Sequence, residues 1–137
     1  MIAKSIVGYL STGIAFALID SVWLRTMYKP LYQTEIGELL MRGLRWGPAV
    51  AFYVLFILGI MIFAVSPAFV SGKWQTALQS GAMFGFFTYM TYDLTNHATL
   101  KVWSTKVTVL DILWGTTLTG LAALAGYLIT TAIFGKA

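Results

Sequence analysis

The sequence predicts an all-α integral membrane protein, a four-helix bundle with an interfacial amphipathic helix in its first loop. Of its 137 residues, 58% are hydrophobic and only 10% are charged, whereas charged residues make up about a quarter of an average soluble domain. The hydrophobic residues form four blocks, each close to the roughly 20 residues that a helix needs to cross the hydrocarbon core. No linker typical of a boundary between soluble domains separates these blocks, so residues 1–137 are expected to form a single transmembrane domain.

The composition also excludes several classes of function. The chain has no cysteine, which excludes disulfides, thiolate metal sites and cysteine nucleophiles. Its formal net charge of +4 comes from basic residues that are scattered over the loops rather than gathered in one stripe. This distribution is typical of contact with lipid headgroups and does not favour nucleic acid. Membrane lipids are therefore the expected partners.

The first hydrophobic block, Ser5–Leu24, follows Lys4 in the manner of a signal peptide. Its apolar run continues too far for a cleaved segment, so we expect a retained first span. Asp20 shares one helix face with Gly13 and Ala17, at spacings of three and four residues. Small residues permit close contact between membrane helices. Asp20 is therefore expected to face a neighbouring helix.

The longest polar interval, Met27–Gly47, is predicted to contain the interfacial helix. Pro30 is suited to its first turn, and Glu38 and Arg42 have the spacing of a helical ion pair. Four apolar residues recur on one face: Ile36, Leu39, Leu40 and Leu44. This helix either anchors the bundle at the headgroups or forms a lid over a site.

Three further spans follow: Pro48–Val65, about Trp74–Leu94, and about Val107–Phe134. The second span has Tyr53 as its only polar side chain and is expected to be purely structural. The third and fourth spans each have a stripe of small residues that leads to a polar end. The stripes are Ala82, Gly85, Phe86, Tyr89, Asp93 and Asn96 in the third span, and Asp111, Gly115, Leu118, Ala122, Ala125 and Gly126 in the fourth.

The distribution of Lys and Arg near the span ends predicts the topology. One side of the membrane has Arg25, Lys29, Arg42, Arg45, Lys101 and Lys106, and the other side has Lys4, Lys73 and Lys136. The richer side is expected to be cytosolic, so the loop around Glu38 would lie in the cytosol and both termini outside. Insertion in both orientations remains an alternative.

Three carboxylates lie one to two turns inside their helix ends, on the same side of the membrane: Asp20, Asp93 and Asp111. The stretch Tyr89–Trp103 around Asp93 also contains the only histidine, His97. Lipid cannot satisfy such groups, so ionisable residues at membrane depth usually mark functional sites. A protonated carboxyl can act as an acid, and an ionised one as a base or an anchor for a cationic ligand. Asp20, Asp93 and His97 are therefore the catalytic candidates.

The ligand-binding candidates are Arg25, Tyr89, Asn96, Asp111 and Trp114. Structural roles remain open for some of them, because Asp111 suits the start of a helix and Asn96 suits the end of one. His97 is as typical of a membrane interface as of a catalyst. The residues identify no cofactor. No metal is expected either, because Asp93 and His97 have the spacing of a ligand pair but no second histidine is present.

Aromatic residues gather near the predicted span ends, where amphipathic rings favour the membrane interface. Those assigned to this belt are Trp23, Tyr28, Tyr32, Trp46, Trp74 and Trp103. Tyr89, Tyr92 and Trp114 are instead suited to line a pocket for an apolar ligand.

The stretch Tyr92–Leu100, followed by Trp103 and by Asp111–Gly115, resembles a bacterial family of predicted membrane proteins catalogued as domain of unknown function number 2177. The resemblance covers essentially the whole chain, including Asp20-x-x-Trp23-Leu24. It departs from the family pattern at Ser104, where a proline usually follows the tryptophan, so the turn into the last span is expected to differ. The resemblance implies a four-helix protein of the bacterial inner membrane and brings no activity with it.

The leading hypothesis is a cytosol-facing pocket that binds or acts on an amphipathic, lipid-like small molecule. Asp20, Asp93 and Asn96 would contact its polar end, and His97 would assist proton transfer. The alternatives are a proton-coupled transporter that works as a homodimer and a structural subunit of a larger membrane assembly. Transport sites usually lie near the midplane, whereas these carboxylates gather at one face. Whether the protein is an enzyme remains open.

Overall fold

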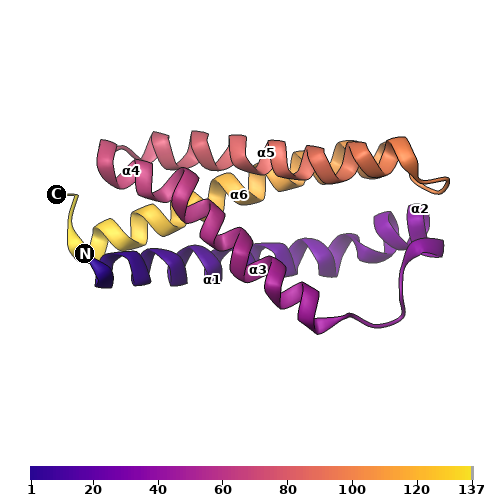
Figure 1. Cartoon of the computed structure of the whole chain (residues 1–137), viewed down its shortest axis with the longest axis horizontal. Helices are drawn as coiled ribbons and strands as arrows, with labels where there is room; N and C mark the ends of the chain where they lie inside the picture. Colours follow the sequence, from indigo (N-terminus) through magenta and orange to yellow (C-terminus); the bar gives the residue numbers. More distant parts are fainter. Residues whose placement is uncertain (137) are drawn as a thin grey trace.

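The structure is a computed structural model that describes residues 1–136, and it is a bundle of four main helices. These helices are α1 (Ile2–Met27), α3 (Trp46–Ile60), α5 (Trp74–Thr99) and α6 (Thr105–Phe134). Helices α1, α5 and α6 extend along the length of the molecule, and α3 crosses it obliquely (Figure 1). Residues 1–136 contain no strand. The prediction of an all-α four-helix bundle is confirmed.

Three helical stretches are long and apolar enough to cross a membrane: Ile2–Leu39, Trp46–Ser71 and Thr105–Phe134. Helix α5 has 26 residues and exposes Met83, Phe86 and Phe87, but it is not among these three stretches because its sequence is more polar. Large apolar side chains are also exposed on the other helices, as expected where lipid rather than water surrounds the bundle. Four membrane crossings remain a prediction, with α5 as the helix in question.

Helix α1 ends at Met27, but the helical stretch does not end with it: a π-helical segment η1 (Tyr28–Gln33), a short α2 (Thr34–Ile36) and a 3₁₀ turn η2 (Gly37–Leu39) continue it. Pro30 has no backbone N–H, so the regular α-helical bond at that position is lost and a wider turn forms. The predicted interfacial helix is therefore a continuation of the first span. Residues 40–45 are not helical, so Glu38 and Arg42 do not share a helical turn.

Helix α6 lies between α1 and α5, and glycines allow the helices to approach closely. A Cβ atom on Gly85 would lie 2.7 Å from the Cβ of Thr119, and one on Gly126 would lie 3.0 Å from the Cβ of Thr12. Larger residues at these positions would push the helices apart. The small-residue stripes on the third and fourth spans are thus contact faces, except at Phe86, which was placed on the stripe of the third span but is exposed.

The expected contact face of the first span is only partly confirmed. Asp20 and Gly13 contact neighbouring helices, but the buried face is centred on Phe16 rather than on Ala17. Helix α1 buries Gly8, Ser11, Thr12 and Phe16, whereas Ala17 is exposed. Phe16 fills the core and makes ring contacts with α3, which turns the Phe16 face inward. Asp20 lies beside this face and is half-buried.

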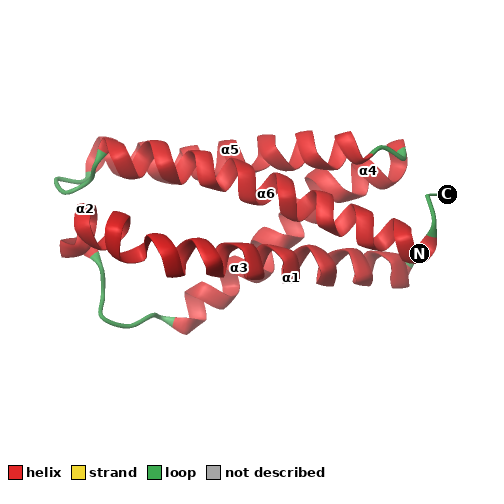
Figure 2. Cartoon of the chain, turned by 180° about the vertical axis from the view of Figure 1, so that it is seen from behind, coloured by secondary structure: helices red, strands yellow, loops and turns green. Residues whose placement is uncertain are grey.

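Helix α3 continues through a π-helical segment η3 (Met61–Val65) into α4 (Ser66–Ser71). Helix α4 ends at Gly72, whose φ of 70° gives the left-handed turn into α5. The first buried residue of α3 is Phe56, and the start of this helix lies apart from α5 and α6 (Figure 1). The loop before α3 and the turn between α5 and α6 lie at the same end of the molecule (Figure 2).

Candidate functional site

A cavity of about 290 Å³ lies where the end of the first helical stretch meets α5 and α6. Asp20, Asp93 and Asp111 all line it, so the structure brings together the three carboxylates that the sequence places near one end of the bundle. The remaining walls are mostly aromatic: Trp23, Tyr28, Tyr32, Tyr89, Tyr92, Trp103 and Trp114, with Leu24, Ile36, Leu40 and Val107. We call this space the acidic cavity.

Asp20 has a hydrogen-bond donor at each carboxyl oxygen. The indole Nε1 of Trp114 donates to Oδ1 at 3.1 Å, and the hydroxyl of Tyr53 donates to Oδ2 at 2.8 Å. The ring of Trp114 also stacks on Trp23, with centroids 4.5 Å apart and planes 7° from parallel. These contacts join α1 to both α3 and α6, and they hold Asp20 in one orientation.

Asp111 connects the last helix to the π-helical segment. The hydroxyl of Tyr32 donates to Asp111 Oδ1 at 2.5 Å and accepts a hydrogen bond from Trp23 Nε1 at 2.9 Å. Leu31, next to Tyr32, is fully buried against the cluster that includes Val107. These contacts hold η1 over the acidic cavity. This is the position that a lid formed by the first loop would have.

Asp93 differs from the other two carboxylates because no N–H or O–H group of another residue type in residues 1–136 donates to it. The carboxyl of Asp111 is the group within hydrogen-bonding reach, and the two can bond only when one of them carries a proton. Its side chain is 0% exposed, and neither Oδ1 nor Oδ2 has a hydrogen-bond partner among the described residues. Most buried polar side chains are hydrogen-bonded, because desolvation of an unpaired group costs several kcal/mol, roughly 2–7 for a neutral polar group and more for a charge. Asp93 is thus an unpaired acceptor on the wall of the acidic cavity.

His97 lies outside the acidic cavity walls. Its Nδ1 is 3.1 Å from the hydroxyl of Thr108, which accepts a hydrogen bond from Trp103 Nε1 at 3.0 Å. Because the hydroxyl oxygen keeps a second lone pair after accepting from Trp103, Thr108 either donates to Nδ1 or accepts from it, and the tautomer of the ring decides which. His97 holds Trp103 against the cavity through Thr108, and its catalytic role remains a prediction.

Two other candidates are not brought to the cavity. Arg25 is exposed in the last turn of α1, and Asn96 is half-buried on α5; neither lines the acidic cavity among the described residues. Tyr89 and Trp114 do line it. A ligand contact for Arg25 or Asn96 remains a prediction that the geometry does not support.

The assignment of aromatic residues to an interfacial belt did not foresee that four of them line the acidic cavity; one of the four, Tyr28, is also 40% exposed. Trp23, Tyr28, Tyr32 and Trp103 line the acidic cavity, whereas Trp46 and Trp74 are exposed, as a belt requires. Trp23 follows Asp20 by three residues and so shares its face, which is a signal that the sequence contained. Tyr32 had no such signal, because the π-helical segment determines where it lies.

A second pocket of about 300 Å³ adjoins the acidic cavity, and we call it the apolar pocket. Tyr89, Tyr92 and Asp111 belong to the walls of both spaces. Phe52 and Phe56 of α3 and Thr88 of α5 complete the apolar pocket. The second span, which was expected to be purely structural, thus provides Tyr53 to Asp20 and two rings to the walls of this pocket, and a functional role for it remains a prediction.

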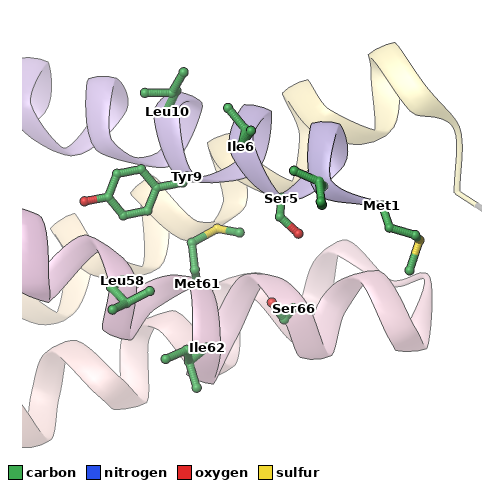
Figure 3. A pocket seen from close by; sticks show the side chains of 10 residues that line it. Met1, Ser5, Ile6, Tyr9, Leu10, Leu58, Met61, Ile62 and Ser66 are labelled. Atoms are coloured by element: carbon green, nitrogen blue, oxygen red, sulfur yellow. The ribbon is translucent and has the colours of Figure 1, made fainter.

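A wider groove of about 560 Å³ runs between the start of α1 and the α3–α4 region (Figure 3). Its walls are mainly aliphatic, with Ser5, Tyr9 and Ser66 as the polar residues. The hydroxyl of Tyr9 already donates to the carbonyl of Val54 at 2.9 Å. No carboxylate lines this groove among the described residues. The acidic side chains that could take part in binding or proton transfer therefore lie at the acidic cavity.

Asp93 and Asp111 lie within hydrogen-bonding reach of each other, whereas Asp20 is bonded separately to Tyr53 and Trp114. Within residues 1–136, no group of three or more His, Cys, Asp or Glu side chains is arranged to hold a metal ion. A cation bound by all three carboxylates would thus need to be larger than a single metal ion.

Comparisons with known proteins address the whole chain. Searches of curated proteins and of solved structures find no match. The family described as "Predicted membrane protein (DUF2177)" matches residues 5–128. This match includes every residue of the acidic cavity, from Asp20 to Trp114, and it confirms the resemblance seen in the sequence. The chain belongs to the DUF2177 family of predicted membrane proteins.

Proposed function

We propose that this protein binds an amphipathic, lipid-like small molecule, with its polar end in the acidic cavity and its hydrocarbon chain in the apolar pocket. The observation that supports this most directly is the wall that the two spaces share. Tyr89, Tyr92 and Asp111 border a space with three carboxylates on one side and a space walled by Phe52 and Phe56 on the other. A molecule that spans this wall must be polar at one end and apolar at the other.

The position of the apolar pocket favours a ligand that enters from the membrane. Helix α3 begins apart from α5 (Figure 1), and Phe52 on its lipid-exposed half is 45% exposed. The pocket therefore lies where hydrocarbon can reach it from the side. Each space, at about 290 Å³ and 300 Å³, is near the lower end of the roughly 300–1,000 Å³ typical of small-molecule sites.

The orientation in the membrane follows from the charge distribution. We place the acidic cavity on the cytosolic side of a bacterial inner membrane, because the loops at this end contain most of the Lys and Arg residues. The N-terminus and the end of α6 lie together at the opposite end (Figure 1), which supports a periplasmic position for both. This arrangement requires α5 to cross the membrane as the fourth span.

The proposal is tested by filling the apolar pocket. Thr88 lines this pocket, whereas Thr91, one turn away on the same helix, is exposed and lines neither space. Both hydroxyls donate to a carbonyl four residues earlier, so the two threonines are matched. The probe is a bromine-labelled alkyl amphiphile, whose binding quenches the fluorescence of Trp23 and Trp114.

We expect Thr88→Phe to weaken binding of this probe by roughly tenfold, which corresponds to about 1.4 kcal/mol. Thr91→Phe should leave the affinity unchanged. Equal affinity of the two folded variants for the probe would refute the proposal, as would the absence of saturable quenching in the unmodified protein.

Proton-coupled transport is a second candidate, favoured by unpaired buried hydroxyls farther along α6. The hydroxyls of Thr119 and Tyr127 are buried without a partner among the described residues. Asp111 and Thr119 are eight residues apart, or roughly 12 Å along the helix axis, which is far beyond hydrogen-bond reach. A proton path would need ordered water between them. If transport occurs, Thr119→Val should abolish proton uptake by liposomes that contain the protein; unchanged uptake would exclude this path.

A further inference from the structure

We infer that the polar end of the bound molecule is an organic cation of the ammonium class, paired with Asp93 and enclosed by aromatic rings. This inference rests on the proposed function and specifies its ligand. It follows from three independent features of the acidic cavity: its charge, the hydrogen-bond capacity of its walls and its aromatic surface.

The charge of the acidic cavity is negative and unbalanced. Asp20, Asp93 and Asp111 line it, and no Lys, Arg or His side chain is among its described walls. A ligand with an anionic end would add charge of the same sign in a region that water screens poorly. A positively charged end would instead complement all three carboxylates.

Four of the seven Trp and Tyr donors on the walls are already in use. The indole N–H groups of Trp23, Trp103 and Trp114 donate to Tyr32, Thr108 and Asp20. The hydroxyl of Tyr32 donates to Asp111. A ligand that needs donors, such as a carboxylate or a phosphate, would have only the hydroxyls of Tyr28, Tyr89 and Tyr92 unless it broke these bonds. Acceptors are available instead, because both oxygens of Asp93 lack a partner within residues 1–136.

Asp93 is the group that requires a partner. It is 0% exposed and lies at the wall of the acidic cavity. A buried carboxylate is retained at membrane depth when it pairs with a charge or lines a functional cavity. The ammonium end of a ligand would provide the counter-charge that Lys and Arg residues do not provide on these walls.

The aromatic walls favour an organic cation over a metal ion. Cations are attracted to the faces of Trp and Tyr rings within about 6 Å of the centroid, and enclosures of such rings are the common way to bind alkylated ammonium groups. Seven aromatic residues line the acidic cavity. The carboxylates do not form a metal-binding group, and Ca²⁺ needs six to eight oxygens at roughly 2.3–2.6 Å.

The test compares amphiphiles that share one alkyl chain and differ only in the head: trimethylammonium, primary ammonium, sulfate and uncharged maltoside. Binding is measured by isothermal titration and tryptophan quenching in an uncharged detergent. We expect the two ammonium heads to bind at least tenfold more tightly than the maltoside and the sulfate, a difference of about 1.4 kcal/mol. Ca²⁺ alone should not compete.

Two variants test the role of Asp93. Asp93→Asn should remove the preference for the ammonium head and keep the affinity for the maltoside. Glu38→Gln is the matched control, because it removes one negative charge from an exposed residue outside the acidic cavity. It should leave the preference intact.

The outcomes separate the two proposals. If the maltoside and the sulfate bind as tightly as the ammonium amphiphiles, the inference of a cationic head is refuted. The proposal of an amphipathic ligand is then unaffected. If no amphiphile binds more tightly to the unmodified protein than to Thr88→Phe, the proposed function fails. Competition by Ca²⁺ would indicate a metal site, and loss of the preference in Glu38→Gln would indicate attraction by overall charge; either result overturns the inference. The comparison of heads uses the unmodified protein, so it decides the question even if Asp93→Asn does not fold.

Discussion

Gly115→Ala tests whether close packing of α6 on Tyr89 builds the wall between the two spaces. A Cβ atom at Gly115 would overlap Cγ and both Cδ atoms of Tyr89. These atoms are at the base of the ring, so a small movement of the tip cannot relieve the overlap. The ring of Tyr89 must therefore move. Because Tyr89 lines both the acidic cavity and the apolar pocket, this movement also changes the wall that the two spaces share.

Two opposing terms determine the effect of Gly115→Ala on stability. Alanine is about 1 kcal/mol more favourable than glycine inside a helix, whereas overpacking typically costs about 1–3 kcal/mol. We therefore expect a net loss of about 0–2 kcal/mol. In a Tyr89→Ala background the overlap disappears, so the same substitution should stabilise the protein by up to about 1 kcal/mol. The coupling energy between the two sites is then about 1–3 kcal/mol.

The assay is denaturant unfolding in mixed micelles, followed by circular dichroism, for the four proteins of the cycle. Gly13→Ala is the control, because its added Cβ would meet Ile57 at an ordinary 3.5 Å. Binding of the bromine-labelled amphiphile should weaken in Gly115→Ala and stay unchanged in Gly13→Ala. The argument is wrong if Gly115→Ala has the same effect on stability in both backgrounds, or if ligand affinity survives.

Three further predictions concern Asp20, the topology and His97. Tyr53→Phe should lower the free energy of unfolding by about 1.5–3 kcal/mol, because it removes a hydrogen bond to a carboxylate. The control Tyr9→Phe loses only a bond to a carbonyl and should lower it by about 0.5–1.5 kcal/mol. Equal losses in the two variants would contradict a special role for Asp20. The chain lacks cysteine, so single cysteines report its topology: an impermeant external thiol reagent should label Gln75→Cys and spare Gly43→Cys, and the reverse result would invert the orientation. His97→Ala should cost about 0.5–1.5 kcal/mol through the lost bond to Thr108 and leave amphiphile affinity unchanged; loss of binding at normal stability would place His97 in the site.

The fold class and the end of the bundle that contains the site were predictable because they depend on local features. The length and the hydropathy of a block determine whether its helix can cross the membrane, and three of the four blocks satisfy both requirements in the structure. The direction of successive spans then places Asp20, Asp93 and Asp111 at one end. The contact face of α6 was also predictable, since glycine and alanine mark it at helical spacing.

Tertiary structure alone decided which residues complete the acidic cavity. Tyr32 reaches Asp111 across 79 residues of sequence, and Tyr53 reaches Asp20 from an otherwise apolar helix. Helical periodicity specifies which residues share a face of one helix, but it does not specify crossing angles or the rotation that a π-helical turn adds. The oblique path of α3 (Figure 1) and the wide turn at Pro30 therefore determine these contacts. The missing partner of Asp93 is likewise a property of the packed bundle, because only packing decides which groups surround a buried carboxyl.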